Sequence, residues 1–156
     1  MIDLFSYLRH FFISNSRHGT HSPFVYAIAD QVIYNKHFKS ANAITYPNGV
    51  KLLPQLHNIL SYLNVRTVSI SLSDLTADAF WLDHVKWDHI EDLLNIIDSG
   101  KIVVIQKPYS KKQSPIWNTL ISDNRVTVSI NLFHFGLLLH RDAQHKEDFW
   151  LRQQLW

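Results

Sequence analysis

The chain has 156 residues, of which 46% are hydrophobic and 18% are charged. This length and composition predict a single folded domain, 1–156, with a substantial core, and they exclude a chain that is disordered throughout. Because 15 basic residues face 13 acidic ones, the net charge is only +2, and no nucleic-acid partner is expected.

The N-terminal part, residues 1–64, is predicted to be helical. Apolar residues three and four apart predict an amphipathic helix over Ile2–Ile13. Ser22 followed by Pro23 predicts the N-cap and the first residue of a second helix. A stripe of leucines and isoleucines over 52–63 predicts a third helix.

Residues 66–141 are predicted to carry the sheet. In chain order we expect strands at 67–72 and 79–82, a helix at 87–97, a strand at 101–106, a helix at 114–121, and strands at 125–132 and 136–140. The helix at 87–97 with its flanking strands predicts a parallel βαβ unit, and the last two strands are predicted to pair antiparallel. Residues 142–156 are predicted to form a terminal helix or a tail that docks.

The connection between the first two predicted strands is unusually short. Only Ser73–Asp78 join them, whereas a parallel crossover takes roughly a dozen residues or more. Three alternatives follow: the two strands are antiparallel, the first strand lies outside its usual place in the sheet, or the strand prediction at 67–72 is wrong.

Two stretches resemble a bacterial family of class I S-adenosylmethionine-dependent methyltransferases. Arg17–Tyr26 reads RHGTHSPFVY and resembles the family's N-terminal RHGxHSPFVY stretch, and Val126–Leu138, which begins with the pattern VTVxINLFxxGL, resembles its last two strands. Ala79–His84 and Lys101–Tyr109 look like two strands of the same family. The resemblance implies an α/β fold: a reduced Rossmann-like three-layer sandwich with N-terminal helices and a C-terminal antiparallel strand pair.

The chain departs from this family where the family holds its cofactor. Ser69–Ala77 contains no glycine, although the family has an acidic, glycine-rich turn there that lets backbone amides approach the cofactor. Two βα units, including the acid that holds the cofactor ribose, have no counterpart in 73–78. Gln106 and Lys107 stand where the family has two acids, which disfavours a divalent cation.

Candidate site residues follow from these positions. Asp83 and His84 end a predicted strand, where open α/β sheets bind ligands, so they are the candidate catalytic residues, against a capping or hydrogen-bonding role. Ser71, Ser73 and Asp74 are candidates for the remnant of a cofactor site, against the alternative of a plain loop.

Three further residues come from the N-terminal stretch. His18, His21 and Ser22 are candidates for a substrate or cap role, and the alternative is that the histidines only fix the loop before the second helix. No metal is expected, because the chain has no cysteine and no third ligand is evident beside these histidines.

Our leading functional hypothesis is a degenerate, non-catalytic methyltransferase-like protein that acts in binding or assembly, with a protein partner or a second copy and without a cofactor. The alternative is an active enzyme that binds S-adenosylmethionine in an unconventional or partner-completed site around Asp74, Asp83 and His84. A third hypothesis is docking through the apolar faces of Ile2–Ile13 and Trp150–Trp156.

The sequence also bears on location. It has no cysteine, no cleavable leader pattern and no apolar run near the roughly 18 residues that span a bilayer. We therefore expect a cytoplasmic protein without a membrane span.

Overall fold

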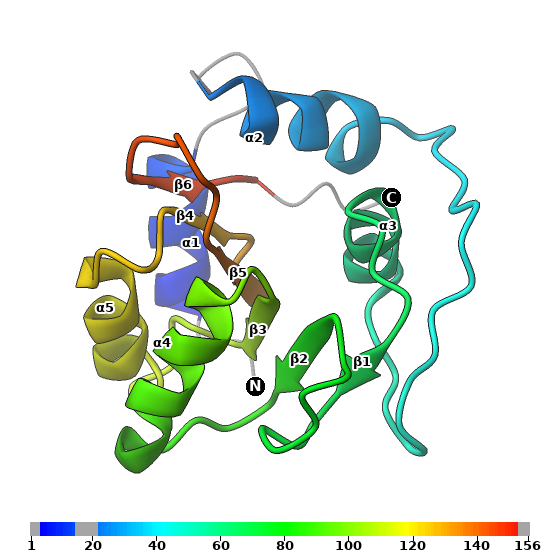
Figure 1. Cartoon of the computed structure of the whole chain (residues 1–156). Helices are drawn as coiled ribbons and strands as arrows, with labels where there is room; N and C mark the ends of the chain where they lie inside the picture. The colour runs from blue at the N-terminus through cyan, green and yellow to red at the C-terminus, as the bar shows by residue number, and fades with distance from the viewer. Residues whose placement is uncertain (1–3, 15–21, 153–156) are drawn as a thin grey trace.

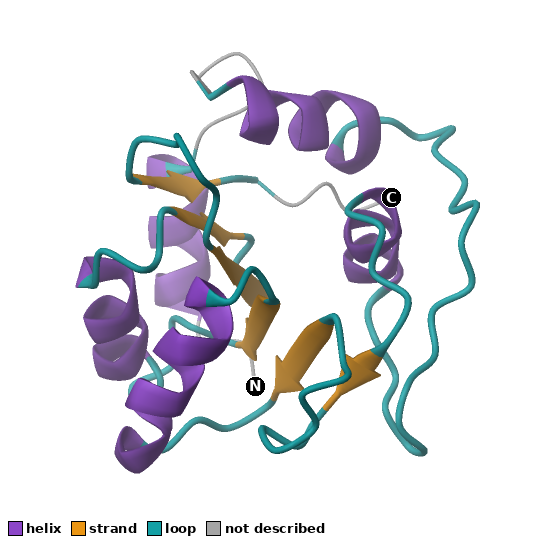
Figure 2. Cartoon of the chain, in the orientation of Figure 1, coloured by secondary structure: helices purple, strands orange, loops and turns teal. Residues whose placement is uncertain are grey.

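The computed structural model describes residues 4–14 and 22–152, which form a mixed six-stranded sheet with helices on both faces (Figures 1 and 2). The helices are α1 (Leu4–Ile13), α2 (Pro23–Ile28), α3 (Pro54–Tyr62), α4 (Ile90–Asp98) and α5 (Ser114–Ser122). The strands are β1 (Val68–Ser69), β2 (Ala79–Leu82), β3 (Ile102–Gln106), β4 (Val128–Asn131), β5 (Phe135–Leu139) and β6 (Glu147–Trp150), in the order β1-β2-β3-β5-β4-β6. The predicted α/β class is confirmed.

Two hydrophobic clusters hold the helices to the sheet. α2 and α3 pack on one face and α4 and α5 on the other. β3 contributes to both clusters, because Ile102 and Val104 face the first and Val103 and Ile105 face the second. This double burial is why the strand reads as a continuous apolar run. β2 and β3 pair in parallel on either side of α4, as predicted.

The helical N-terminal part agrees with the sequence prediction. The Ser22 hydroxyl accepts a hydrogen bond from the Val25 N–H at 3.4 Å and caps α2, which continues as a π-helical turn, Ala29–Ile33. α3 begins at Pro54 and ends at Tyr62. Asn64 follows with a φ of 61°, in the left-handed region that is typical of helix ends. His18 and His21 lie outside the described residues.

The predicted strand over 67–72 is wrong in its length. β1 contains only Val68 and Ser69, and Ile70 is 54% exposed instead of buried. The chain turns there because the Ser71 N–H donates a hydrogen bond to Ser69 Oγ at 3.1 Å, so it leaves the sheet.

The short connection does not make β1 antiparallel. β1 pairs in parallel with β2, in the register Val68 to Ala79, so that alternative is wrong. A loop over 70–78 takes the place of a crossover helix. The Asp78 carboxylate closes it by accepting hydrogen bonds from the N–H groups of Arg66 and Thr67 at 2.9 and 3.0 Å.

The C-terminal segment corrects a second prediction. β4 and β5 pair antiparallel as expected. Of the two alternatives for 142–156, the terminal helix is wrong for the described residues 142–152, where β6 instead docks on the sheet by pairing in parallel with β4. β6 covers the outer edge of β4, whose four residues are all buried. The polar side chain of Ser129 is satisfied there by Asp148, at 2.6 Å.

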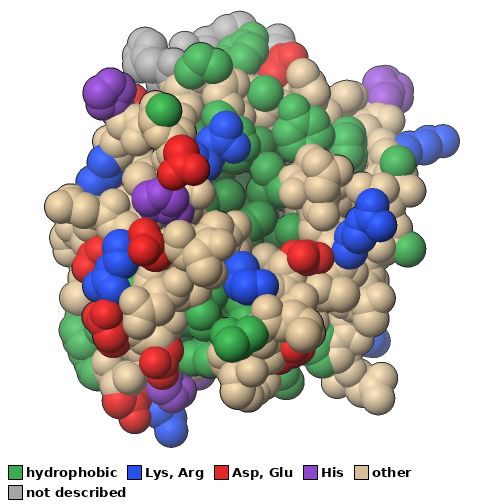
Figure 3. Space-filling view, viewed as in Figure 1, with side chains coloured by type: hydrophobic (Ala, Val, Ile, Leu, Met, Phe, Trp, Pro, Cys, Tyr) green, Lys and Arg blue, Asp and Glu red, His purple; other side chains and the backbone are tan. Residues whose placement is uncertain are grey.

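Charged side chains are mixed on the face of the molecule seen in Figure 3. Basic and acidic groups alternate around a central hollow in which hydrophobic side chains gather. This face therefore has no continuous basic track for a phosphate backbone. No helix within residues 4–14 and 22–152 is long and apolar enough to cross a bilayer.

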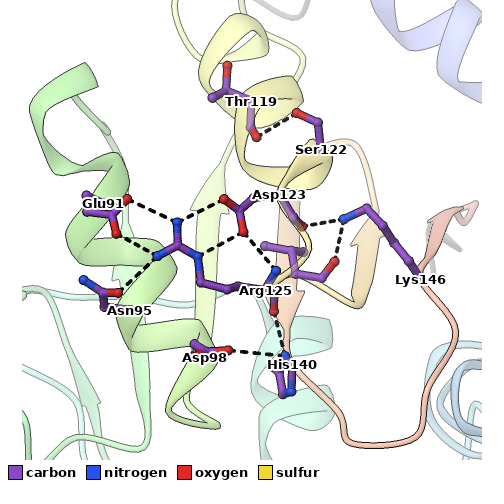
Figure 4. A network of polar contacts seen from close by, with 10 residues as sticks. Glu91, Asn95, Asp98, Thr119, Ser122, Asp123, Arg125, His140 and Lys146 are labelled. Carbon is purple, nitrogen blue, oxygen red and sulfur yellow. Dashed lines mark hydrogen bonds and ion pairs between the residues drawn. The ribbon is translucent and has the colours of Figure 1, made fainter.

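A polar network ties α4 to the start of β4 (Figure 4). The Arg125 guanidinium donates to Glu91 Oε1 at 2.7 Å and to Asp123 Oδ1 at 3.0 Å. The Lys146 ammonium donates to the Asp123 carbonyl oxygen at 2.6 Å. Three segments distant in sequence are thereby joined at one corner.

We expect acid to weaken this corner through Asp123. The hydrogen bond from Arg125 lowers the pKa of Asp123 from 3.8 to about 2. The ionised carboxylate therefore stabilises the fold fully above its pKa in the unfolded chain, and this stabilisation is lost as the pH falls towards its pKa in the folded chain. The free energy of unfolding, measured by urea titration between about pH 5 and pH 2, should therefore fall less steeply for Asp123→Asn than for the unmodified chain. Equal dependence of the free energy of unfolding on pH in the variant and in the unmodified chain would contradict a contribution of Asp123.

Candidate functional site

A cleft of about 1130 Å³ opens at the C-terminal ends of β1, β2 and β3. Of the predicted site residues, Ser73, Asp83 and His84 line it together, while Ser71 and Asp74 lie in the adjoining loop without lining it. The C-terminal edge of an open α/β sheet is where such folds bind ligands. The residues predicted at the end of β2 therefore lie on the cleft.

The short β1 leaves room for the cleft. β1 pairs only with Ala79 and Phe80, whereas β2 continues through Leu82. Trp81 and Leu82 then line the cleft in place of a further pair of strand partners. Because β1 is short, the space beside the end of β2 remains open.

The loop over 70–78 uses its own polar groups internally. Backbone N–H groups of five of its residues donate within the segment 69–77, namely those of Ser71, Asp74, Leu75, Thr76 and Ala77. The hydroxyls of Ser71 and Ser73 lie 2.8 Å apart and hydrogen-bond to each other. A loop bonded in this way offers few free donors to a ligand.

Asp74 is also occupied within this loop. Its Oδ1 accepts hydrogen bonds from the Thr76 hydroxyl at 2.6 Å and from the Thr76 N–H at 3.3 Å. The hydroxyl bond holds the pKa of Asp74 below its usual range. The carboxylate therefore stays ionised and serves the turn.

A buried glutamine that contacts His84 was not predicted from the sequence. Gln113, which is 3% exposed, accepts from the Val85 N–H at 3.1 Å and donates to the Val85 carbonyl oxygen at 3.2 Å. These two bonds fix the orientation of the amide, so its NH₂ group also donates to His84 Nδ1, at 3.1 Å. In the neutral imidazole the proton is then on Nε2.

Gln113 thus positions the segment that carries Asp83 and His84. In the sequence, Gln113 stands out only by its place just before the helix that starts at Ser114-Pro115. That place does not indicate that its side chain bonds to the Val85 backbone. A polar residue that bonds a distant backbone can be recognised only once the two segments are adjacent in space.

Replacing Gln113 with alanine should cost about 2 kcal/mol, because the polar groups of a buried backbone lose their partners. The free energy of unfolding from urea titration measures this loss, and the NMR signals of His84 should broaden or move as its segment loosens. Gln144→Ala, at a half-buried glutamine remote from the cleft, is the matched control and should be nearly neutral. A Gln113→Ala variant as stable as this control would contradict the positioning role.

In the described part of the chain, no three histidine, aspartate or glutamate side chains lie close enough together to hold a metal ion. Gln106 lines the cleft at the end of β3, and the backbone N–H of Lys107 bonds to the His134 carbonyl oxygen at 2.9 Å. Lys107 is not among the residues that line the cleft, so the contribution of β3 to the cleft wall is the neutral side chain of Gln106.

Comparison of the chain with protein-family models, with curated proteins and with solved structures found no match.

Proposed function

We propose that this chain is a reduced, non-catalytic relative of class I S-adenosylmethionine-dependent methyltransferases, with a Rossmann-like sheet, that acts as a binding or assembly module. The observation that carries the proposal is the internal bonding of the loop over 70–78. Its amides, its serine hydroxyls and the Asp74 carboxylate are used within the segment, although these are the groups by which a nucleotide-type cofactor would be held.

The side chains at the cleft mouth support binding of another kind. Ile70 and Leu75 lie on this loop and are 54% and 69% exposed, and across the cleft α4 contributes Asp92 and Asn95. A cleft lined by both apolar and polar side chains suits an amphipathic ligand or a segment of a partner protein.

Isothermal titration with S-adenosylmethionine and with S-adenosylhomocysteine tests the proposal. We expect no heat of binding attributable to a dissociation constant below about 1 mM. Micromolar binding of either compound would overturn the non-catalytic function, and the Asp83→Asn variant would then show whether the cleft is the binding site.

An active methyltransferase is the second candidate, and the position of Asp83 and His84 on a large cleft at the strand ends favours it. If a second chain completes the site, binding of S-adenosylmethionine should appear only at protein concentrations at which the chain associates. Binding that is absent at every concentration counts against this candidate.

Docking through the apolar face of α1 is the third candidate function. Leu4 and Leu8 lie one turn apart on α1 and are 67% and 43% exposed, which supports a role for this face in association. Sedimentation equilibrium of Leu4→Glu against Lys39→Glu, at an exposed position on another segment, measures it. Only the first substitution should reduce association, and a concentration-independent monomer mass for the unmodified chain would exclude assembly with itself.

A further inference from the structure

α1 turns one side away from the protein, and this side is apolar apart from one cation. Leu4, Phe5 and Leu8 are 67%, 77% and 43% exposed. Arg9 is exposed as well. Positions 4, 5, 8 and 9 lie on one side of a helix, because residues three and four apart are neighbours on its surface. His10, on the opposite side, is only 5% exposed. We call Leu4, Phe5, Leu8 and Arg9 the outer face of α1.

The cleft at the strand ends extends along α4 as a groove. The lining residues that come from this helix and its two ends are spaced mostly three and four apart: His89, Asp92, Asn95, Ile96 and Ser99. Residues at this spacing form one side of a helix, so the groove follows α4 for about 15 Å. The loop over 70–78 adds Ile70, Leu72 and Leu75 to the lining. The groove therefore matches the length of α1, whose ten residues also span about 15 Å.

The two surfaces carry opposite charges. Asp83 and Asp92 line the cleft and are exposed, and no described residue forms a hydrogen bond or an ion pair with either carboxylate. Lys51 also lines the cleft, so two carboxylates face one ammonium group there. On the outer face of α1, Arg9 likewise has no such partner among the described residues, and no residue of 4–13 is acidic. Each surface thus carries a charge that the other can neutralise.

α1 cannot fill the cleft of its own chain. The His10 ring bonds through Nε2 to the Leu151 carbonyl oxygen at 2.9 Å, which holds α1 beside the end of β6. β6 and β1 lie at opposite edges of the sheet, in the order β1-β2-β3-β5-β4-β6, and the cleft lies at the ends of β1, β2 and β3. Contact between the two surfaces therefore requires two copies of the chain.

We propose that the outer face of α1 of one copy docks in the cleft of a second copy. The apolar residues of this face then cover Ile70 and Leu75, which are otherwise exposed. The Arg9 guanidinium pairs with the Asp92 carboxylate of the second copy. The inference rests on the proposed assembly function and names a second copy as the partner. Because two different surfaces meet, the contact repeats into open chains or closes into a ring.

Sedimentation equilibrium of two variants, alone and mixed, tests the proposal. Leu8→Glu disrupts the outer face and keeps the cleft, whereas Leu75→Glu disrupts the cleft and keeps the face. Both side chains are exposed, so the fold should be retained, which circular dichroism checks. We expect each variant alone to associate at least about tenfold more weakly than the unmodified chain. An equal mixture should form dimers and nothing larger, because each pair has only one intact face and one intact cleft.

Reversal of the charges tests the ion pair separately. Arg9→Glu should weaken association by about tenfold, and Arg9→Glu combined with Asp92→Lys should recover most of this loss. Arg66→Glu, at an exposed arginine just before β1 and outside both surfaces, is the matched control and should leave association unchanged.

Several outcomes would overturn the docking of α1 in the cleft. If Leu75→Glu alone associates as strongly as the unmodified chain, association uses a surface other than the cleft, and assembly stands without this contact. A mixture that remains monomeric, or a charge-reversed double variant no better than Arg9→Glu, has the same meaning. An unmodified chain that is monomeric at every concentration excludes docking between copies, and binding to another partner then remains as the proposed function.

Discussion

Replacing Gly136 with alanine is expected to destabilise the fold by about 3 kcal/mol, because the added methyl group has no space. A Cβ at this position would lie 2.4 and 2.5 Å from Cη2 and Cζ3 of Trp117. Gly136 pairs with Ile105 on one side and Asn131 on the other, so the strand cannot move away. Urea unfolding at constant pH measures the change in free energy.

Two comparisons identify the Trp117 ring as the cause. Gly49→Ala meets no atom within 4 Å and should cost only about 1 kcal/mol, because its φ of +84° disfavours a side chain. In a Trp117→Leu background the cost of Gly136→Ala should fall well below its value in the unmodified chain. An undiminished cost there would contradict the steric explanation.

Leu93→Ala is expected to cost about 2–5 kcal/mol, the range for a leucine removed from a close-packed core. Leu93 is fully buried on α4 in the cluster that joins α4 and α5 to the sheet. Leu75→Ala makes the same chemical change at a side chain that is 69% exposed, and it should alter stability by less than about 0.5 kcal/mol.

Leu75→Ala and Leu93→Ala together also distinguish an effect on stability from an effect on ligand binding. Leu75 lies on the mouth of the cleft, so its removal should weaken any apolar ligand there while leaving the urea midpoint unchanged. Thermal unfolding followed by circular dichroism provides an independent measure. Similar losses of stability for Leu75→Ala and Leu93→Ala would mean that the loop over 70–78 belongs to the core.

Local signals were sufficient for the helices. The Ser22 hydroxyl accepts from an N–H of the very next turn, Pro23 has no N–H to leave unpaired at the first helical position, and the left-handed φ of Asn64 follows directly on the end of α3. Such signals involve near neighbours in the chain, so a sequence displays them directly. The apolar run of β3 is equally direct, because both faces of the strand are covered.

The two errors have different causes, the first local and the second long-range. Alternating serines at 69, 71 and 73 are typical of a strand, but hydrogen bonds among these serines turn the chain out of the sheet after β1. β6 contains Glu147 and Asp148 and does not read as a buried strand. It forms because β4 offers it a parallel edge and a partner for Asp148.

The candidate site likewise contains residues that the sequence predicts and features that it does not. Asp83 and His84 follow from the rule that strand ends carry ligands, and they do line the cleft. The cleft itself follows from the shortness of β1, and Gln113 reaches His84 and Val85 from 28 or more residues away. Neither could be inferred from spacing alone.

The hydrogen bond from His10 to Leu151 joins residues 141 positions apart and therefore sets an order of events during synthesis. α1 is therefore synthesised well before the carbonyl oxygen and the strand on which it docks. Until that strand is made, the helix lacks this part of its packing surface, which favours its binding by a chaperone that holds nascent chains.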